Sequence, residues 1–331
     1  MKYSKLGRSN MTVSKICLGT MHFGPKASEE ESFKIMDRAL EIGINFFDTA
    51  NVYGSKGRSE EIIGNWFSQR PGSRERVVLA TKVYHSMADP KIPNEERGIS
   101  LYKVRKHCAD SLRRLQTDHI DLYQVHHFDR WISGEEWWRI FEKLVADGDV
   151  LYVGTSNFPG WGLAKFQMLA CQRGFMGLIS EQTQYNLLNR IPELEVLPAG
   201  REFGIGILAY MPLAGGLLTG KLHAAEGTRT RDLEKEYHMS LGENNQQLMN
   251  FSKLCREIGE KEHIVATAWT LMHPEVHSAI VGIHTMEQLD GIERASELEL
   301  SPEVMARLDD LFDINRGRPL QKGESPEAYS Y

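Results

Sequence analysis

Short apolar runs alternate with longer amphipathic stretches along almost the whole chain, and this alternation limits the folds open to it. Eight runs are rich in β-branched or other apolar residues, as buried strands are. They cover Ile16–Gly19, Asn45–Asp48, Val77–Val83, Leu122–His126, Tyr152–Ser156, Ile179–Gln182, Gly206–Tyr210 and Ser278–Gly282. A strand followed repeatedly by a helix predicts parallel strands joined by right-handed crossovers. Eight such units are typical of a closed barrel, so we expect an α/β protein with the (β/α)8 TIM-barrel fold.

The stretches between the runs repeat apolar residues at helical spacing. The predicted helices cover Glu30–Glu41, Glu60–Phe67, Ser100–Leu115, Glu135–Ala146, Gly160–Arg173, Leu194–Phe203, Asn244–Gly259, His263–Met272 and Met286–Glu293. A chain of 331 residues often holds two domains, but α/β barrels of this length form one. We therefore expect residues 1–331 to be a single barrel domain.

Three segments depart from the alternation. The opening MKYSKLGRSNMTVSK places a turn at Gly7–Asn10 between short β-like pieces, which predicts a hairpin that plugs the bottom of the barrel. The insert Pro212–Leu241 is rich in glycine, and so long an insert is usually functional or disordered. The polar tail from Asn315 is either part of the site or a frayed terminus.

Composition excludes several classes of protein. No apolar stretch approaches the roughly 20 residues of a membrane span, and the opening residues do not form a signal peptide. The net charge is −6 with no basic cluster, so nucleic acid is not an expected partner. The four cysteines are scattered, which favours reduced and mostly buried thiols. We expect a cytoplasmic protein of unknown oligomeric state.

Polar or amphipathic side chains stand where the predicted strands end. They are Asp48, Lys82, His126, Ser156, Asn157, Gln182 and Tyr210. One such residue is often only a loop cap, but a whole series in register is hard to explain by capping. Active sites of barrels form at this carboxyl-terminal rim. The sequence therefore predicts the site there.

The predicted chemistry is proton transfer beside a cationic amine. Tyr53 follows Asp48 in FFDTANVYG, and a free phenol with a pKa near ~10 is a weak acid. An ammonium about 4 Å away stabilises phenolate by up to ~4 kcal/mol, or roughly three pKa units. Lys82 is the candidate, with Asp48 orienting it and neutral His126 donating to a carbonyl oxygen. The alternative for Tyr53 is a packed rim aromatic.

Other chemistries find little support. We expect no metal site, because there is no HExxH and His126 and His127 are adjacent rather than spaced on a helix face. Strand alternation is expected to turn His127 away from the lumen, and His85 and His107 are interpreted as surface residues. The first run lacks a GxGxxG and no Gly-x-Ser-x-Gly elbow is present, so neither a Rossmann domain nor an α/β-hydrolase is indicated.

Motifs along nearly the whole chain resemble the aldo-keto reductase superfamily. The matching segments are KICLGTMHFG, FFDTANVYG, GRSEEIIGNWF, VVLATKV, DHIDLYQVHH, LYVGTSNF, EQTQYNLLNR and LAYMPLAGGLLTGKL. The stretches FFDTANVYG and LYVGTSNFPGW and the ending PEAYSY are most similar to a bacterial branch with keto-deoxysugar reductases. Sibling branches include aryl-alcohol oxidoreductases and channel-associated β subunits.

The resemblance implies a catalytic tetrad of Asp48, Tyr53, Lys82 and His126. Tyr53 would be the acid in reduction and the base in oxidation. The resemblance also implies a nicotinamide cofactor, NADPH with NADH possible, bound on the rim and touching Asp48 as well. The other implied cofactor contacts are Ser156, Asn157 and Gln182 (carboxamide), Tyr210 (ring stacking), Gly19, Thr20 and Met21 (floor), Met211, Pro212, Leu213, Gly215, Leu217, Lys221 and Arg231 (phosphates), and Gly282, His284 and Gln288 (adenine end).

One stretch departs from the family pattern near the adenine end. His284 stands where Arg or Ser is usual and Ile292 where Asn is usual, while Gln288 is retained. A neutral imidazole offsets a 2′-phosphate less well than a guanidinium does. The preference between NADPH and NADH is therefore open, and Lys221 and Arg231 are candidate compensating charges.

The expected function is reduction of a small-molecule carbonyl, an aldehyde or ketone of sugar-like character, by hydride transfer from NAD(P)H. The alternative is a cofactor-sensing regulatory subunit on the same barrel. The loops after Met21, Tyr84, His126 and Tyr210 are expected to form the substrate walls. The aromatic and histidine residues there fit a sugar, an aryl ring or plain packing: Phe23, Tyr84, His85, Phe128 and Trp131.

Overall fold

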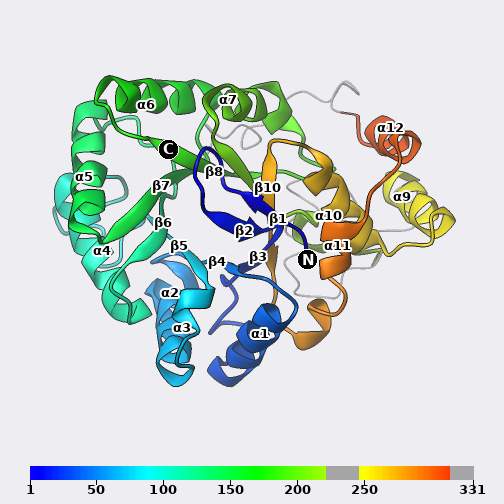
Figure 1. The fold of residues 1–331 in the computed structure, drawn as a ribbon, viewed down its shortest axis with the longest axis horizontal. Coiled ribbons are helices and arrows are strands. Elements are labelled where there is room, and N and C mark those ends of the chain that lie inside the picture. Colours follow the sequence, from blue (N-terminus) through cyan, green and yellow to red (C-terminus); the bar gives the residue numbers. More distant parts are fainter. Residues whose placement is uncertain (221–245, 314–331) are drawn as a thin grey trace.

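The computed structural model describes residues 1–220 and 246–313, and within them eight parallel strands close into a barrel. Figure 1 shows these strands at the centre with helices arranged around them. The strands are β3 (Ile16–Gly19), β4 (Phe46–Asp48), β5 (Val78–Val83), β6 (Ile120–Val125), β7 (Val150–Ser156), β8 (Leu178–Gln184), β9 (Gly206–Tyr210) and β10 (Val276–Gly282). Each pairs in parallel with its neighbour in sequence, and β10 pairs with β3. The predicted (β/α)8 barrel is confirmed.

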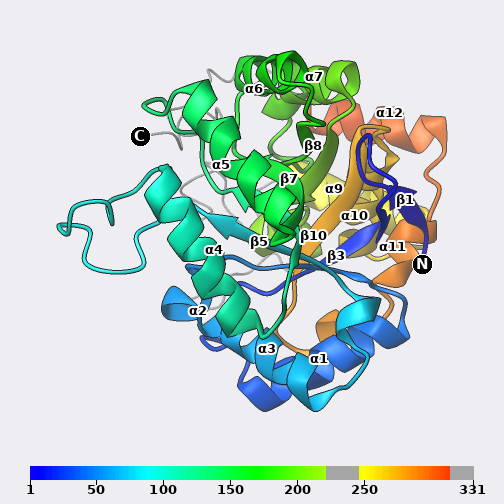
Figure 2. The same cartoon turned by 60° about the vertical axis from the view of Figure 1, so that its left-hand side comes forward.

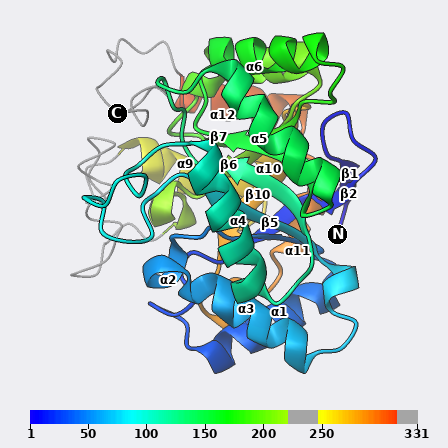
Figure 3. The same ribbon diagram turned by 90° about the vertical axis from the view of Figure 1, so that its left-hand side faces the viewer.

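The predicted N-terminal hairpin is also present. Strands β1 (Tyr3–Lys5) and β2 (Thr12–Ser14) pair antiparallel. Leu6 and Val13 are fully buried among side chains of the barrel interior. The turn at Gly7 has a φ of +53°, and a Cβ there would lie 2.1 Å from the Ile179 carbonyl oxygen, so only glycine fits this close approach. The hairpin therefore closes one end of the barrel, as Figure 3 shows.

Amphipathic helices cover the outside of the barrel. Several begin at a serine whose side chain accepts from the backbone of the first turn; Ser28 does so with Glu31 in a capping box. The helices are α1 (Glu29–Glu41), α2 (Tyr53–Lys56), α3 (Arg58–Gln69), α4 (Leu101–Leu115), α5 (Gly134–Asp147), α6 (Gly160–Gln172), α7 (Val196–Phe203), α9 (Gln246–Glu257), α10 (Glu262–Met272), α11 (Glu293–Glu297) and α12 (Pro302–Leu311). None of the described helices is long and apolar enough to cross a bilayer.

Two of the elements near the C-terminus differ from the sequence prediction. The predicted helix Met286–Glu293 is a 3-10 turn over Met286–Gln288 followed by α11, because Gly291 adopts a φ of +74° between them. Helix α12 was not predicted, although Ser301 caps it and Pro302 is its first residue, a typical start signal. The tail from Asn315 and residues 221–241 of the insert lie outside the described residues.

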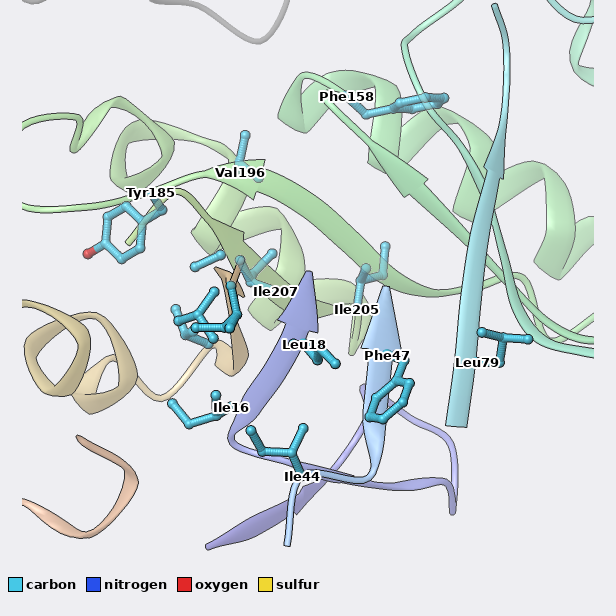
Figure 4. Packing of buried hydrophobic residues seen from close by; sticks show 14 of the residues in the cluster. Ile16, Leu18, Ile44, Phe47, Leu79, Phe158, Tyr185, Val196, Ile205 and Ile207 are labelled. Atoms are coloured by element: carbon cyan, nitrogen blue, oxygen red, sulfur yellow. The ribbon is translucent and has the colours of Figure 1, made fainter. Parts of the chain in front are cut away.

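Two clusters of buried side chains hold the barrel together. The larger packs the outer faces of the strands against the helices, and Figure 4 shows Leu18, Phe47 and Leu79 on three neighbouring strands. The smaller fills the lumen with residues such as Phe46 and Leu208. All four cysteines are free, and three of them are buried, as predicted.

The end of the barrel opposite the hairpin carries the long segment between β5 and α4, which projects in Figures 2 and 3. The Lys103 ammonium fastens this segment by donating to the carbonyl oxygens of Tyr84 (2.6 Å) and Glu96. Burial lowers the pKa of Lys103 to about 8, although Glu95, Glu96 and Asp129 oppose the shift. The carboxyl ends of the strands, and the predicted site, lie at this same end.

Candidate active site

Strand periodicity places the predicted catalytic residues on the inner face of the barrel. Alternate residues of a strand point to the same face. Phe46 and Ala80 belong to the cluster that fills the lumen, and two residues later come Asp48 and Lys82. The polar pair therefore forms the layer above the apolar plug, where the strands end. Both side chains are almost fully buried.

Lys82 is the centre of the predicted tetrad. Its Nζ donates to Asp48 Oδ2 at 2.5 Å and to the Thr49 carbonyl oxygen at 2.9 Å. The same ammonium lies 3.3 Å from the Tyr53 hydroxyl, and that hydroxyl lies 3.4 Å from His126 Nε2. The Tyr53 ring also lies under Lys82, with Nζ 4.8 Å from the ring centre. The structure thus brings all four predicted residues together.

The second oxygen of Asp48 is held by two amides. Gln182 Nε2 donates to Asp48 Oδ1 at 2.8 Å and Gln124 Nε2 donates to it at 3.1 Å. Gln124 follows Leu122 of the lumen cluster by two residues, so periodicity places it in the same layer. Sequence analysis missed Gln124, although a buried amide in the apolar run of DLYQVHH was a usable signal. These bonds fix the carboxylate that orients Lys82.

Burial and nearby charge set the protonation states of Lys82 and His126. Burial alone would lower the pKa of Lys82, but the charges of Asp48 and Tyr53 together raise it, so the amine remains protonated. Burial lowers the pKa of His126 well below its usual value, and Lys82, His127 and His85 add to this shift. The site therefore combines a fixed ammonium with a neutral imidazole around one phenol hydroxyl.

The residues predicted to bind the nicotinamide carboxamide also lie beside this group. Asn157 has a φ of +59°, and its Nδ2 donates to the His126 carbonyl oxygen and to Ser156 Oγ, both at 3.0 Å. The Tyr210 hydroxyl donates to Asn157 Oδ1 at 2.9 Å. Because Gln182 directs its amide nitrogen at Asp48, its carbonyl oxygen is the end that would accept from the carboxamide.

Glu181 organises the loop that carries these residues. Its Oε1 accepts from the Phe158 backbone N–H at 3.0 Å and its Oε2 accepts from the Thr155 hydroxyl at 2.5 Å. Burial raises the pKa of Glu181 to about 8, and the hydrogen bonds from Thr155, Phe158 and Asn157 only partly oppose the shift. Sequence analysis gave this residue no role, although an acidic residue in the buried run ISEQTQ is unusual.

The predicted floor of the cofactor site is tightly built. A Cβ on Gly19 would meet Ile280 Cγ2 at 2.9 Å, so a larger residue would fill this floor. The Thr20 hydroxyl donates to the Asp48 carbonyl oxygen at 3.0 Å and joins the ends of β3 and β4. Met21 is partly buried next to them. These contacts fix the backbone at the strand ends where the sequence predicts the floor of the cofactor site.

At the predicted adenine end, the backbone holds Gln288 in place. Gln288 Oε1 accepts from the His284 backbone N–H at 2.8 Å and closes a capping box with Thr285. The His284 ring packs edge-on against His22, with centroids 5.3 Å apart, and lies two residues after Gly282. Burial, and then the charge of Lys26, lower the pKa of His284.

The predicted phosphate loop adopts an unusual backbone. Met211 and Ala214 have positive φ values of 55° and 47°, and Gly215 and Gly216 follow with 66° and 114°. Alternation of right- and left-handed residues forms concavities of backbone N–H groups that bind anions. Within the loop, Pro212 and Leu217 are buried, whereas Leu213 is partly exposed. Lys221 and Arg231 lie outside the described residues.

Two histidine predictions were wrong, and a third, for His85, holds only in part. His107 is buried, with its Nδ1 3.2 Å from Asn51 Nδ2. His127 is not turned away, because the chain has left β6 at Val125 and the ring stacks on His126 with centroids 4.9 Å apart. His85 is only partly exposed and packs edge-on against both rings, at 5.1 and 5.0 Å.

Some of the predicted substrate walls are packing residues. Phe23 and Phe128 are buried, and Phe128 packs edge-on against Phe158 at 4.9 Å. Trp131 is 96% exposed, and Tyr84 packs against His85 with centroids 5.6 Å apart. The ring that contacts the Tyr53 hydroxyl is the imidazole of His126, and His85 and His127 pack against that imidazole.

A barrel with a buried lysine–carboxylate pair beside a rim tyrosine and histidine defines a class of nicotinamide-dependent oxidoreductases. Comparison with family models agrees, because residues 15–313 match the model of the aldo/keto reductase family. The chain belongs to that family, and it is an NAD(P)H-dependent oxidoreductase.

Relatives share this similarity along almost their whole length. The chain is 50% identical to the uncharacterized oxidoreductase YrpG of Bacillus subtilis over all of both chains. It is 32% identical to a putative aryl-alcohol dehydrogenase of Schizosaccharomyces pombe, covering 94% of this chain and 95% of the relative. It is 31% identical to a putative voltage-gated potassium channel subunit beta of the same yeast, covering 93% and 92%.

Proposed function

We propose that this protein reduces a sugar-like aldehyde or ketone to an alcohol, with Tyr53 as the general acid. The observation that carries the proposal is the position of the Tyr53 hydroxyl, 3.3 Å from Lys82 Nζ and 3.4 Å from His126 Nε2. Bound NAD(P)H would supply the hydride. The chain supplies orientation and the proton, which passes from the Tyr53 hydroxyl to the carbonyl oxygen as the alcohol forms.

Each neighbour of Tyr53 has a separate role in this proposal. The Lys82 ammonium stabilises the phenolate that remains after proton transfer. Neutral His126 donates a hydrogen bond that orients the carbonyl oxygen. Asp48 holds Lys82 in place and is itself held by Gln124 and Gln182.

The cofactor would lie across the rim from the nicotinamide end near Tyr53 to the adenine end near His284. Ser156, Asn157 and Gln182 would bind the carboxamide, and Tyr210 would stack on the ring. The backbone of residues 211–217, with Lys221 and Arg231, would hold the phosphates. The positive φ values of Met211, Ala214 and Gly215 support this placement, because such alternation of backbone conformation forms concavities that bind anions.

The sugar-like character of the substrate rests on the polarity around Tyr53. His126 contacts the Tyr53 hydroxyl, His85 and His127 lie together with His126, and neutral imidazoles both donate and accept hydrogen bonds. Hydroxyl groups next to the reacting carbonyl would bond to such rings. An aryl substrate would need apolar walls, whereas Phe23 and Phe128 are buried in packing.

Cofactor binding and turnover test the proposal together. Titration with NADPH or NADH should quench the tryptophan fluorescence saturably. A simple aldehyde should then oxidise the bound cofactor, which is measured as a fall in absorbance at 340 nm. Keto sugars should be turned over with a higher kcat/KM than aryl aldehydes of similar size. Absence of saturable binding for both cofactors would overturn the reductase function, and a preference for aryl aldehydes would overturn the substrate class.

The similarity to a putative channel subunit keeps one alternative, a cofactor-sensing regulatory subunit on the same barrel. Such a protein would bind NADPH tightly but would reduce carbonyls slowly. Multiple turnovers with sugar-like substrates at rates above about 1 s⁻¹, as in ordinary enzymes, would favour the enzyme.

Replacing His284 by arginine tests the adenine end. We expect a modest preference for NADPH that strengthens as His284 gains a proton and pairs with the 2′-phosphate. Because burial and Lys26 lower the pKa of His284, the increase should occur below about pH 6.5, the usual value for histidine. His284→Arg should widen the preference and flatten its pH dependence, since arginine stays charged. The measurement is the ratio of kcat/KM for NADPH and NADH from pH 5.5 to 8. A preference for NADH at every pH, unchanged by the substitution, would exclude His284 from the 2′-phosphate site.

A further inference from the structure

Three imidazoles meet at the rim of the barrel and form a group that the sequence did not reveal, and one of them, His126, lies beside the Tyr53 hydroxyl. His126 and His127 follow β6, and His85 follows β5. One ring nitrogen of each lies within 4.8 Å of those of the other two. No other group of three or more such ligands occurs in the part of the chain that the structure describes. Adjacent strands of the barrel thus deliver three metal-type ligands to one point.

We propose that His85, His126 and His127 form a binding site for a borderline-soft divalent metal such as Zn²⁺, and that metal binding there blocks carbonyl reduction. Imidazole nitrogen suits Zn²⁺, and sites with three histidines and a water in the fourth position are well known for this ion. A metal ion held by these three histidines would compete with the carbonyl substrate. It is distinct from a resident catalytic metal.

The geometry requires a small closure of the rings. Tetrahedral ligands at Zn–N distances of 2.0–2.1 Å lie about 3.3 Å apart, so the most distant pair must approach by roughly 1.5 Å. His85 and His127 are only partly buried, which gives the ion access and the rings room to turn. His126 is nearly buried, and its Nδ1 has no hydrogen-bond partner among residues 1–220 and 246–313. A buried nitrogen without a hydrogen-bond partner is unfavourable, and a bound metal ion would satisfy its lone pair.

Charges around the group work against a cation and limit its affinity. Arg97 acts on both His85 and His127, and Lys82 acts on His126 and His127. Lys82 is already paired with Asp48, whereas Arg97 is exposed and can be replaced without disturbing the barrel. Replacing Arg97 by glutamine should therefore tighten metal binding.

Metal binding would prevent binding of the carbonyl substrate but not binding of the cofactor. An ion held by the His126 ring would lie next to the place of the carbonyl group, because the Nε2 atom of that ring is 3.4 Å from the Tyr53 hydroxyl. Inhibition should be competitive with the carbonyl substrate and should leave the affinity for NADPH unchanged. Metal binding itself does not depend on the proposed reaction, and only the inhibition does.

The test titrates the intact protein with Zn²⁺ against a chromophoric zinc indicator at pH 8, where even ordinary imidazoles are neutral. His85→Gln and His127→Gln, made separately, should each weaken the strongest site by at least about tenfold, since even outer partners of metal ligands contribute roughly 10–100-fold. Arg97→Gln should strengthen it. His119→Gln is the matched control, because His119 contacts Asp118 and Asp121 at the opposite end of β6 and offers a competing surface site.

Inhibition is measured in parallel as the ratio of activity with and without Zn²⁺ for each variant. The inhibition constant should rise with the dissociation constant in His85→Gln and His127→Gln and remain unchanged in His119→Gln. Co²⁺ added to the unmodified protein gives a readout that needs no variant, since three imidazoles should produce intense visible bands of a tetrahedral ion. The proposal is overturned if the strongest site survives both substitutions, if it is lost in His119→Gln, or if bound Co²⁺ is octahedral. Binding without inhibition would overturn the competitive role and leave the reductase proposal intact.

Discussion

Tyr53→Phe is expected to abolish carbonyl reduction while cofactor binding stays nearly intact. The change removes the hydroxyl that lies between Lys82 and His126. It keeps the ring, which packs under Lys82 at 4.8 Å and edge-on against His126 at 5.6 Å. The loss of kcat should reach at least the ~10²–10⁴-fold typical of a general acid. Steady-state rates and NADPH titration by fluorescence quenching measure the two properties.

Tyr152→Phe is the matched control for this prediction. Tyr152 is also on a barrel strand, but it lies near the hairpin end of the lumen and outside the tetrad. Its activity should stay within a few-fold of the unmodified protein. Activity of Tyr53→Phe within the same range would remove Tyr53 from the role of proton donor.

The barrel was predictable because two local signals agreed along the chain. Buried parallel strands give continuous apolar runs, and the helices between them repeat apolar residues at helical spacing. Ile16–Gly19 and Gly206–Tyr210 agree with β3 and β9 to the residue. The short C-terminal elements were harder, because the stretch from Met286 to Glu293 looks helical until Gly291 interrupts it.

Site residues could be predicted from the sequence where a single polar residue ends an apolar strand run. Asp48 and Lys82 follow this rule, and periodicity alone would have added Gln124. Glu181 was missed because its role depends on a loop conformation, with Asn157 at positive φ, that no sequence pattern specifies. The resemblance to a known family named the tetrad, but the contacts with Gln124 and Glu181 came from the structure.

The three histidines lie beyond the ends of their strands, where strand periodicity no longer predicts side-chain direction or contacts. Alternation predicts side-chain direction only while the chain remains a strand. In the structure β6 ends at Val125. His127 lies beyond that end, so strand alternation does not determine the direction of its side chain. His85 lies 41 residues before His126, and only the pairing of β5 with β6 brings the two loops together. The proposed metal site is therefore a product of barrel topology rather than of sequence spacing.

Lys82→Met should reduce turnover by a comparable factor for a different physical reason. The phenolate charge of Tyr53 raises the pKa of Lys82, and such an interaction is reciprocal, so the ammonium must favour the phenolate. Without it, Tyr53 is a weaker acid in reduction and a base that forms only at higher pH in oxidation. The limb of the oxidation profile that rises with pH should move upward, by as much as roughly three units.

Removing Lys82 also leaves Asp48 buried without its cation, and breaking a buried pair destabilises a protein by about 3–5 kcal/mol. A lost activity could therefore reflect unfolding, which thermal denaturation would detect. The double variant Asp48→Asn with Lys82→Met removes both charges, and its asparagine can still accept from Gln124 and Gln182. It should fold better than Lys82→Met and show the same displaced pH profile. If the rising limb stays where it is in both folded variants, Lys82 acts only by packing, and the electrostatic account of Tyr53 is wrong.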